Sequence, residues 1–251
     1  RGADIPPLTF AWIHRATFTR KMRGLLSRIC LSRLVNVLQR FESGITQLAV
    51  KWHMASQGVR VYAPIPSYTH PGELCAMYRF IARRRVKSVI EVGSHLGNSL
   101  LFIAAAVGPK GHVFCIDTWR NNAMPGGRRD TYAEFQRNVR SMKSRITAIR
   151  IDADENPQVN TLPPKVDLVF IDADHRYQSV LRDIRVYSPF VRDGGYFVFH
   201  DFGAWSGVTM AVGDLLRTCK WRPEELFRSL LFLKREHLED DWAKWNRLGC
   251  Q

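Results

Sequence analysis

A glycine turn between a buried strand and an apolar helix restricts this chain to an α/β fold more strongly than any other feature. Residues 88–92 are rich in β-branched side chains, which is typical of a buried strand. Gly93 and Gly97 follow, and residues 98–107 form an apolar run of helical length. Glycine also lets the backbone come close to a bound ligand. The order strand, glycine turn, helix therefore predicts a loop that holds a nucleotide-like cofactor.

Strands and helices alternate along the rest of the chain. After the first strand and helix, the patterns predict strand 112–117, helix 130–143, strand 146–151, strand 166–171, helix 176–188, strand 195–200, helix 207–219 and a late strand near 229–234. Repeated strand–helix units favour a doubly wound, mostly parallel sheet. We therefore expect an α/β, Rossmann-like domain over residues 70–251, introduced by a helix at 71–83.

Residues 1–69 are expected to form a basic, largely helical N-terminal extension and linker. Residues 1–60 hold ten Lys or Arg against two acids, in a chain with a net charge of +14. Between residues 20 and 52, apolar side chains recur at helical steps, namely Leu34, Leu38, Phe41, Ile45, Leu48 and Trp52. The catalytic domain, a second subunit of a homo-oligomer, or an anionic membrane surface could cover that face. The charge also suits nucleic acid and does not choose between these partners.

The cysteine pattern and the hydropathy of the chain indicate the cellular compartment in which we expect the protein. Five cysteines without a C-x-x-C pair signal neither a disulfide framework nor a zinc site. No apolar run approaches the roughly 20 residues that span a bilayer, and no signal-peptide core is visible. We therefore expect a cytoplasmic protein, with peripheral membrane contact through the basic arm as the alternative. The chain starts at Arg1 without Met, so what precedes it stays open.

The loop after the first strand carries an acid instead of a third glycine. A dinucleotide fingerprint needs its glycines spaced as G-x-G-x-x-G, whereas Gly93 and Gly97 lie four residues apart. Glu91 stands two residues before the first glycine, and an anion there suits a cationic ligand group better than a diphosphate. Glu91, Gly93, Ser94 and Gly97 are therefore candidate cofactor-binding residues.

Polar residues also end three of the later strands. Asp117 ends the second strand, where a carboxylate can accept hydrogen bonds from both hydroxyls of a ribose, and Trp119 follows it as a candidate wall of the pocket. Asp172 ends an apolar strand, and the pair His200-Asp201 ends the next one. Because carboxyl ends of parallel strands share one edge, Asp172, His200 and Asp201 form a candidate site for a divalent cation.

These motifs resemble those of class I S-adenosylmethionine-dependent methyltransferases. The sequences Ile-Asp-Ala-Asp-His and Phe-His-Asp resemble in particular the macrocin and mycinamicin group of metal-dependent sugar O-methyltransferases, and more distantly catechol O-methyltransferase and cephalosporin hydroxylase. The resemblance covers about residues 70 to 235. It implies S-adenosylmethionine as cofactor, adenine contact at Asp152, magnesium at Asp172 and the pair His200-Asp201, and a catalytic base at His175. His200 departs from the usual oxygen ligand, so manganese is a candidate beside magnesium, and His200 could instead support the metal ligands from behind or act as a base.

The expected activity is methylation of a hydroxyl on a sugar or another small natural product, with Asp172 and His175 at the reacting group. A nucleic-acid methyltransferase that uses the basic arm is the first alternative, although no Asn-Pro-Pro-Tyr-type motif is present. A dinucleotide oxidoreductase is disfavoured by the glycine spacing. A cephalosporin-hydroxylase-like or non-enzymatic member of the same fold stays open, because a fold alone does not choose its substrate.

Overall fold

The computed structural model describes residues 47–60, 64–121, 127–151 and 161–236. The expected helical face over residues 20–52 lies mostly outside these ranges, as does Asp152. Its described end belongs to a helix over residues 47–56, in which Leu48 and Trp52 are exposed while Val50 and Met54 are buried. Of the helices in the described ranges, none combines the length and apolar character needed to cross a bilayer.

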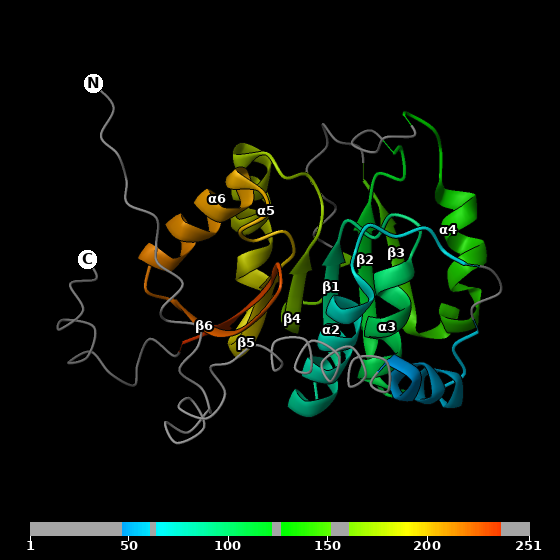
Figure 1. The fold of residues 1–251 in the computed structure, drawn as a ribbon. Coiled ribbons are helices and arrows are strands. Elements are labelled where there is room, and N and C mark those ends of the chain that lie inside the picture. Colours follow the sequence, from blue (N-terminus) through cyan, green and yellow to red (C-terminus); the bar gives the residue numbers. More distant parts are fainter. Residues whose placement is uncertain (1–46, 61–63, 122–126, 152–160, 237–251) are drawn as a thin grey trace, which may run out of the picture. The chain divides into compact units, whose positions relative to one another are not determined.

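Seven strands form one twisted sheet in the order β3-β2-β1-β4-β5-β7-β6 (Figure 1). Neighbouring strands from β3 to β5 are parallel, whereas β7 runs antiparallel to both β5 and β6. The strands are β1 (Ser88–Val92), β2 (His112–Asp117), β3 (Ile146–Arg150), β4 (Val166–Ile171), β5 (Val191–Phe199), β6 (Trp221–Phe227) and β7 (Leu230–Arg235). The expected doubly wound, mostly parallel sheet is confirmed.

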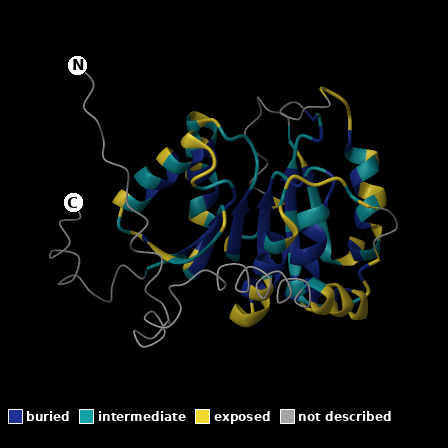
Figure 2. Cartoon of the chain, in the orientation of Figure 1, coloured by how far each residue is buried: buried dark blue, intermediate teal, exposed yellow. Residues whose placement is uncertain are grey.

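Helices cover both faces of the sheet and bury two separate apolar layers. They are α2 (Pro71–Arg84), α3 (Asn98–Val107), α4 (Tyr132–Val139), α5 (Tyr177–Tyr187) and α6 (Ser206–Arg217), with 3₁₀ turns η2 (Arg140–Arg145) and η4 (Ser188–Phe190). Successive residues of a strand enter opposite layers, since Val89 packs with α2 and α3 whereas Ile90 packs with α5 and α6. Figure 2 shows the resulting buried strands between helices with exposed outer faces.

Two details differ from the expectation. The sequence pattern missed β6, because this edge strand contains Pro223 and is only partly buried along most of its length. The helix expected at 130–143 is shorter, since α4 ends at Val139 and continues as the 3₁₀ turn η2.

The carboxyl ends of β1, β2, β4 and β5 meet at one edge of the sheet. Val92 pairs with Ile116 and with Ile171, and Ile171 pairs with Phe199, so the loops that follow these strands begin side by side. Several non-glycine residues of these loops have positive φ, namely His95, Trp119, Asn121 and Asp201. Backbone strain of this kind concentrates at functional sites. The edge is therefore where a site is expected.

Candidate active site

The two glycines of the first loop are required by packing within the protein. Gly93 has φ of 91°, and a Cβ built on it would lie 2.0 Å from the backbone oxygen of Asp172. Gly97 has φ of 87°, and its Cβ would lie 2.5 Å from a methyl group of Val139. Both backbone angles belong to the left-handed region that favours glycine. The glycine turn thus brings the end of β1 directly against the end of β4, where Asp172 begins the next loop.

Glu91 holds this loop from inside the protein. Its carboxylate is completely buried and accepts hydrogen bonds from the hydroxyls of Ser94 and Ser99, each at 2.7 Å. Burial raises the pKa of Glu91 to about 7, against the opposing effect of the two hydroxyls. Because Glu91 has no exposed surface and Ser94 is also buried, Glu91 orders the loop through its bonds with Ser94 and Ser99. The direct contact with a cationic group that we expected does not fit this geometry.

Asp117 lies where a ribose ligand was expected, at the carboxyl end of β2. One of its carboxylate oxygens accepts the backbone N–H of His95 and the other accepts that of Trp119, both at 2.7 Å. Each oxygen keeps a lone pair for a further hydrogen bond. Trp119 is buried, packs against Phe135 and donates its indole N–H to the backbone oxygen of His95. It therefore supports the loop from within instead of lining a pocket.

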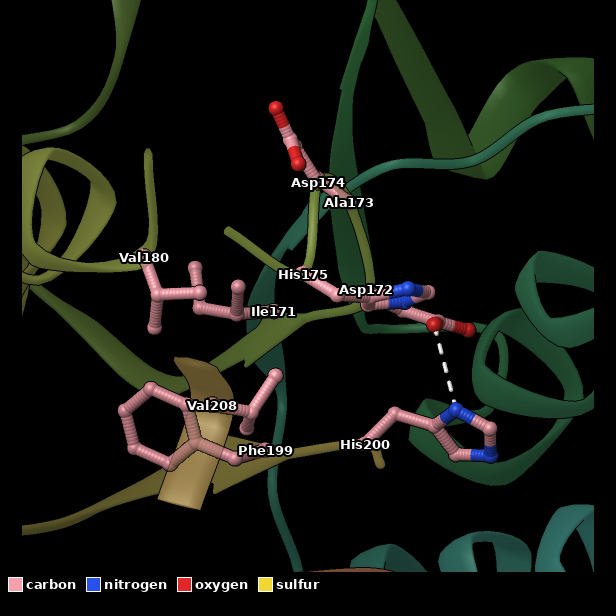
Figure 3. Close-up of a pocket in the computed structure, with 9 residues that line it drawn as sticks. All are labelled: Ile171, Asp172, Ala173, Asp174, His175, Val180, Phe199, His200 and Val208. Carbon is pink, nitrogen blue, oxygen red and sulfur yellow. Dashed lines mark ion pairs between the residues drawn. The ribbon is translucent and has the colours of Figure 1, made fainter. Parts of the chain in front are cut away.

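Two carboxylates and one imidazole gather at the ends of β4 and β5. Single ligand atoms of Asp172, His175 and Asp201 all lie within 4.8 Å of one another, which is a spacing that one divalent cation can bridge. His175 Nε2 lies 2.9 Å from Asp201 Oδ2. Asp174, which points away from this cluster in Figure 3, accepts hydrogen bonds from Arg176 and Ser179 at the start of α5. The first acid of the Asp-Ala-Asp-His motif is thus the one that faces the site.

His200 is the sequence candidate whose role changes. We expected it to be a metal ligand, but its ring is buried and both nitrogens face carboxylates. Nδ1 lies 3.2 Å from Asp172 Oδ1 and 3.1 Å from Asp201 Oδ2. These are ion-pair contacts without hydrogen-bond geometry. Nε2 lies 3.3 Å from Glu73 Oε2. A ring that is protonated on both nitrogens has no lone pair for a metal, so the groups left to hold a cation are Asp172 and Asp201, with His175 beside them.

The charges of the cluster support this assignment. Burial disfavours the imidazolium of His200, but contacts with Asp172, Asp201 and Glu73 outweigh burial and raise its pKa to about 12. Contact with Asp201 raises the pKa of His175 above its ordinary value. Burial opposes ionisation of Asp201, yet its two histidine partners hold its pKa well below the usual range. The cluster is therefore a set of anions held together by buried positive charge.

A small pocket opens beside these groups (Figure 3). Its floor is apolar and is formed by Ile171, Val180, Phe199 and Val208 from β4, β5, α5 and α6. Asp172, His175 and His200 supply its polar wall. The empty volume of the pocket is about 200 Å³, which is smaller than a typical small-molecule site of roughly 300–1,000 Å³.

Two residues of the site escaped the sequence interpretation. Trp205 is 54% exposed, and its ring stacks on His175 with centroids 4.8 Å apart. Its position four residues after Asp201, at the N-terminus of an amphipathic helix, was the only sequence signal. Glu73 reaches His200 from α2, and its sequence signal was only that of a helix N-terminus.

Comparison with known proteins gives a matching domain family and several similar folds. Residues 90–202 match the sequence model of the methyltransferase-domain family. The fold resembles an O-methyltransferase from Bacillus cereus in complex with SAH, with a TM-score of 0.56 and 12% identity over 76% of this chain and 90% of that one. It also resembles an SAH-bound methyltransferase of Podospora anserina, with a TM-score of 0.55 and 13% identity over 75% and 88%. A third similar structure is the O-methyltransferase TomG of Streptomyces achromogenes, which is involved in tomaymycin synthesis and was solved with SAM. Its TM-score is 0.53, and the sequence identity is 12% over 73% of this chain and 89% of that one.

A relative in sequence is an uncharacterized protein of Acanthamoeba polyphaga mimivirus, 48% identical over 46 residues. The aligned segment is 18% of this chain and 21% of that protein, so it carries no functional argument. The family match over residues 90–202, which is less than half of the chain, and the similar folds support a methyltransferase domain with a Rossmann-like architecture.

Proposed function

We propose that the protein is an S-adenosylmethionine-dependent O-methyltransferase that methylates a hydroxyl of a sugar or another small natural product. The observation that carries the proposal is the meeting of Asp117 and the glycine loop with Asp172, His175 and Asp201 at one sheet edge. The SAM- and SAH-bound O-methyltransferases of similar fold support the donor and the reaction class. The resemblance to the macrocin and mycinamicin group supports the sugar acceptor.

The charge of the edge suits this donor. The chain carries a net charge of +14, yet its carboxyl edge gathers the acids Asp117, Asp172 and Asp201. A cationic sulfonium is attracted to such an edge, whereas a diphosphate is repelled. In the proposed complex Asp117 accepts both ribose hydroxyls, and the loop from Ser94 to Gly97, held by Glu91 from within, lines the methionyl end.

A divalent cation fits the oxygen ligands of this site, and Asp172 and Asp201 would hold it. Bound there, magnesium or manganese would lower the pKa of an acceptor hydroxyl. His175 then serves as the general base. Its Nε2 faces Asp201 Oδ2 at 2.9 Å, so a proton on Nε2 would leave the lone pair of Nδ1 to take the hydroxyl proton. Stacking against Trp205 limits rotation of the ring.

In the transfer step, the acceptor oxygen forms a bond to the methyl carbon while the carbon–sulfur bond of the donor breaks. The hydroxyl proton passes to Nδ1 of His175, and S-adenosylhomocysteine leaves with the electron pair on sulfur. The protein's contribution is to hold oxygen and methyl about 3 Å apart and in line.

Asp117→Ala is expected to weaken S-adenosylmethionine binding about 10-fold, because two charge-assisted hydrogen bonds to the ribose are lost. Titration calorimetry measures the dissociation constants of wild type and variant. Asp193→Ala is the matched control, since Asp193 is an exposed acid on β5 whose side chain pairs with Arg235. Equal affinity of the Asp117 variant and wild type would contradict the ribose assignment.

Chelation tests the cation. Incubation with EDTA, followed by its removal, is expected to lower methyl transfer about 10-fold or more, and added manganese or magnesium to restore it. Transfer of the labelled methyl group to acceptor is the measurement. Full activity after chelation would remove the cation from the mechanism and leave His175 as the only activating group.

The function itself is tested by offering the full chain labelled S-adenosylmethionine and a panel of acceptors. Hexopyranosides and phenols represent the two hydroxyl classes, and RNA represents the alternative raised by the basic charge. Transfer to a hydroxyl of the first two classes is the expected result. Transfer to RNA alone, or tight binding of NADH in place of S-adenosylmethionine, would overturn the proposal.

A further inference from the structure

Glu73 is a buried acid that lies outside the part of the chain matching the methyltransferase-domain family. It occupies the first turn of α2, and its exposed fraction is 4%. One carboxylate oxygen accepts the backbone N–H of Ser229 at 3.0 Å and its hydroxyl at 2.8 Å. The other accepts the backbone N–H of His70 at 3.2 Å and Nε2 of His200 at 3.3 Å. Glu73 therefore links α2 and the turn between β6 and β7 to the candidate active site.

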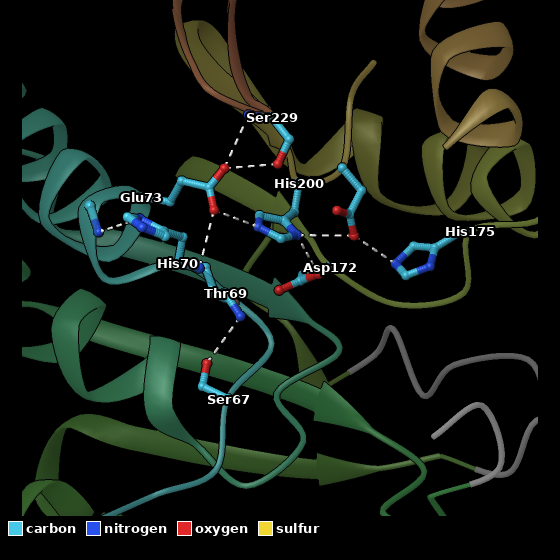
Figure 4. A network of polar contacts seen from close by, with 10 residues as sticks. Ser67, Thr69, His70, Glu73, Asp172, His175, His200 and Ser229 are labelled. Atoms are coloured by element: carbon cyan, nitrogen blue, oxygen red, sulfur yellow. Dashed lines mark hydrogen bonds and ion pairs between the residues drawn. The ribbon is translucent and has the colours of Figure 1, made fainter. Parts of the chain in front are cut away.

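A continuous path of contacts leads from Glu73 to His175 (Figure 4). His200 Nδ1 lies within 3.2 Å of both Asp172 Oδ1 and Asp201 Oδ2. The same oxygen of Asp201 lies 2.9 Å from His175 Nε2. The orientation of the His200 ring therefore sets where the two carboxylates stand, and Asp201 in turn sets the orientation of His175. Glu73 contacts the other nitrogen of that ring, Nε2, and so fixes the ring from the opposite side.

We propose that Glu73 is a positioning residue of the methyl-transfer site, which fixes His200 so that Asp172, Asp201 and His175 hold their working arrangement. The inference rests on the proposed function, because it assigns a purpose to that arrangement. It also extends the active site beyond residues 90–202, since α2 and the turn before β7 supply its inner support.

The hydrogen-bond pattern requires a carboxylate of this length. Two backbone N–H groups and the His200 ring can only donate in these contacts, and they divide between the two oxygens. A glutamine at this position would turn its NH₂ group toward a donor on one side or the other. An aspartate would keep the charge and the helix-terminal preference but would be one methylene short of His200. Glu73→Gln and Glu73→Asp thus disturb the same contact by different means.

A purely structural role for Glu73 is the competing explanation, because the residue also completes the capping box of α2. His70→Ala separates the two roles. It removes the ring nitrogen that accepts the N–H of Gly72 and leaves Glu73, Ser229 and His200 in place. If Glu73 serves only the helix terminus, then the Glu73 variants and His70→Ala have the same consequences.

The test uses the full chain with ¹⁵N-labelled histidine, which labels the rings of its eight histidines. Glu73→Gln and Glu73→Asp are both expected to move the ring-nitrogen signals of His175, three contacts away, and to lower kcat about 10- to 100-fold. The dissociation constant for S-adenosylmethionine stays within about twofold, because Glu73 does not touch the cofactor loop. His70→Ala lowers the melting temperature by a few degrees and leaves the His175 signals unchanged.

Glu73 variants that lower the melting temperature but leave the His175 signals and kcat as in wild type would overturn the inference. The positioning role is also excluded if His70→Ala moves the His175 signals as far as the Glu73 variants do. The spectrum needs no acceptor, so it decides the positioning role even if the proposed methyl transfer fails. Conversely, methyl transfer that persists unchanged in Glu73→Gln would sink this inference and leave the proposed function standing.

Discussion

Replacing His175 with Ala is expected to lower methyl transfer about 100-fold or more, while the affinity for S-adenosylmethionine stays within about twofold. The reason is that the variant loses the imidazole that lies beside Asp172 and Asp201. Among the described residues, His175 is the only histidine in this position that solvent reaches, since 31% of its side chain is exposed. The buried His200 cannot take its place, because both of its nitrogens face carboxylates. Single-turnover measurement of labelled methyl transfer checks the rate.

The matched control is His112→Ala, which removes an imidazole at the opposite end of β2, where His112 Nε2 contacts Thr147 at 2.8 Å. Calorimetric titration with manganese then separates the two roles open to His175. If His175 is the base, manganese affinity in the Ala variant stays near that of wild type. A parallel loss of manganese affinity and rate would make it a ligand, and an unchanged rate would remove it from the mechanism.

The sheet and its active edge could be predicted because their signals are local. The run from Ser88 to Val92 and the apolar strand before Asp172 show the burial that parallel strands require. Once the strands are taken as parallel, their carboxyl ends must share an edge, and the polar residues after them must meet. This is why the sequence alone places Asp117, Asp172 and Asp201 at one site.

The parts that escaped prediction depend on contacts between distant residues. Glu73 and His200 are separated by 127 positions, and nothing in the pattern around either residue indicates the other. Their contact, together with Asp172 and Asp201, turns His200 from an expected ligand into a buried cation. The complete burial of Glu91 could not be predicted either, because an acid near the end of a strand has the same sequence pattern whether its carboxylate is buried or exposed.

Gly93→Ala is expected to lower the free energy of unfolding by about 3 kcal/mol or more. Placing a Cβ at φ of 91° costs about 1–2 kcal/mol by itself. Overlap with the backbone oxygen of Asp172, 2.0 Å away, adds about 1–3 kcal/mol. The chain cannot move aside cheaply, because the N–H of Gly93 donates to Ile116 and that of Asp172 donates to Val92, both at 2.9 Å. Urea unfolding measures the loss.

Gly58→Ala separates the two costs, since Gly58 has φ of 84° and no described atom lies within 4 Å of its added Cβ. This control is expected to lose only the cost of the left-handed backbone, about 1–2 kcal/mol. The difference between the two losses of unfolding free energy then measures the cost of the overlap between a Cβ at the end of β1 and the backbone at the end of β4. Because the clash falls on Asp172, Gly93→Ala should also weaken manganese binding, whereas Gly58→Ala should not. Equal stability losses and equal manganese affinities would mean that the loop relaxes freely, and that the glycine turn does not hold Asp172 in place.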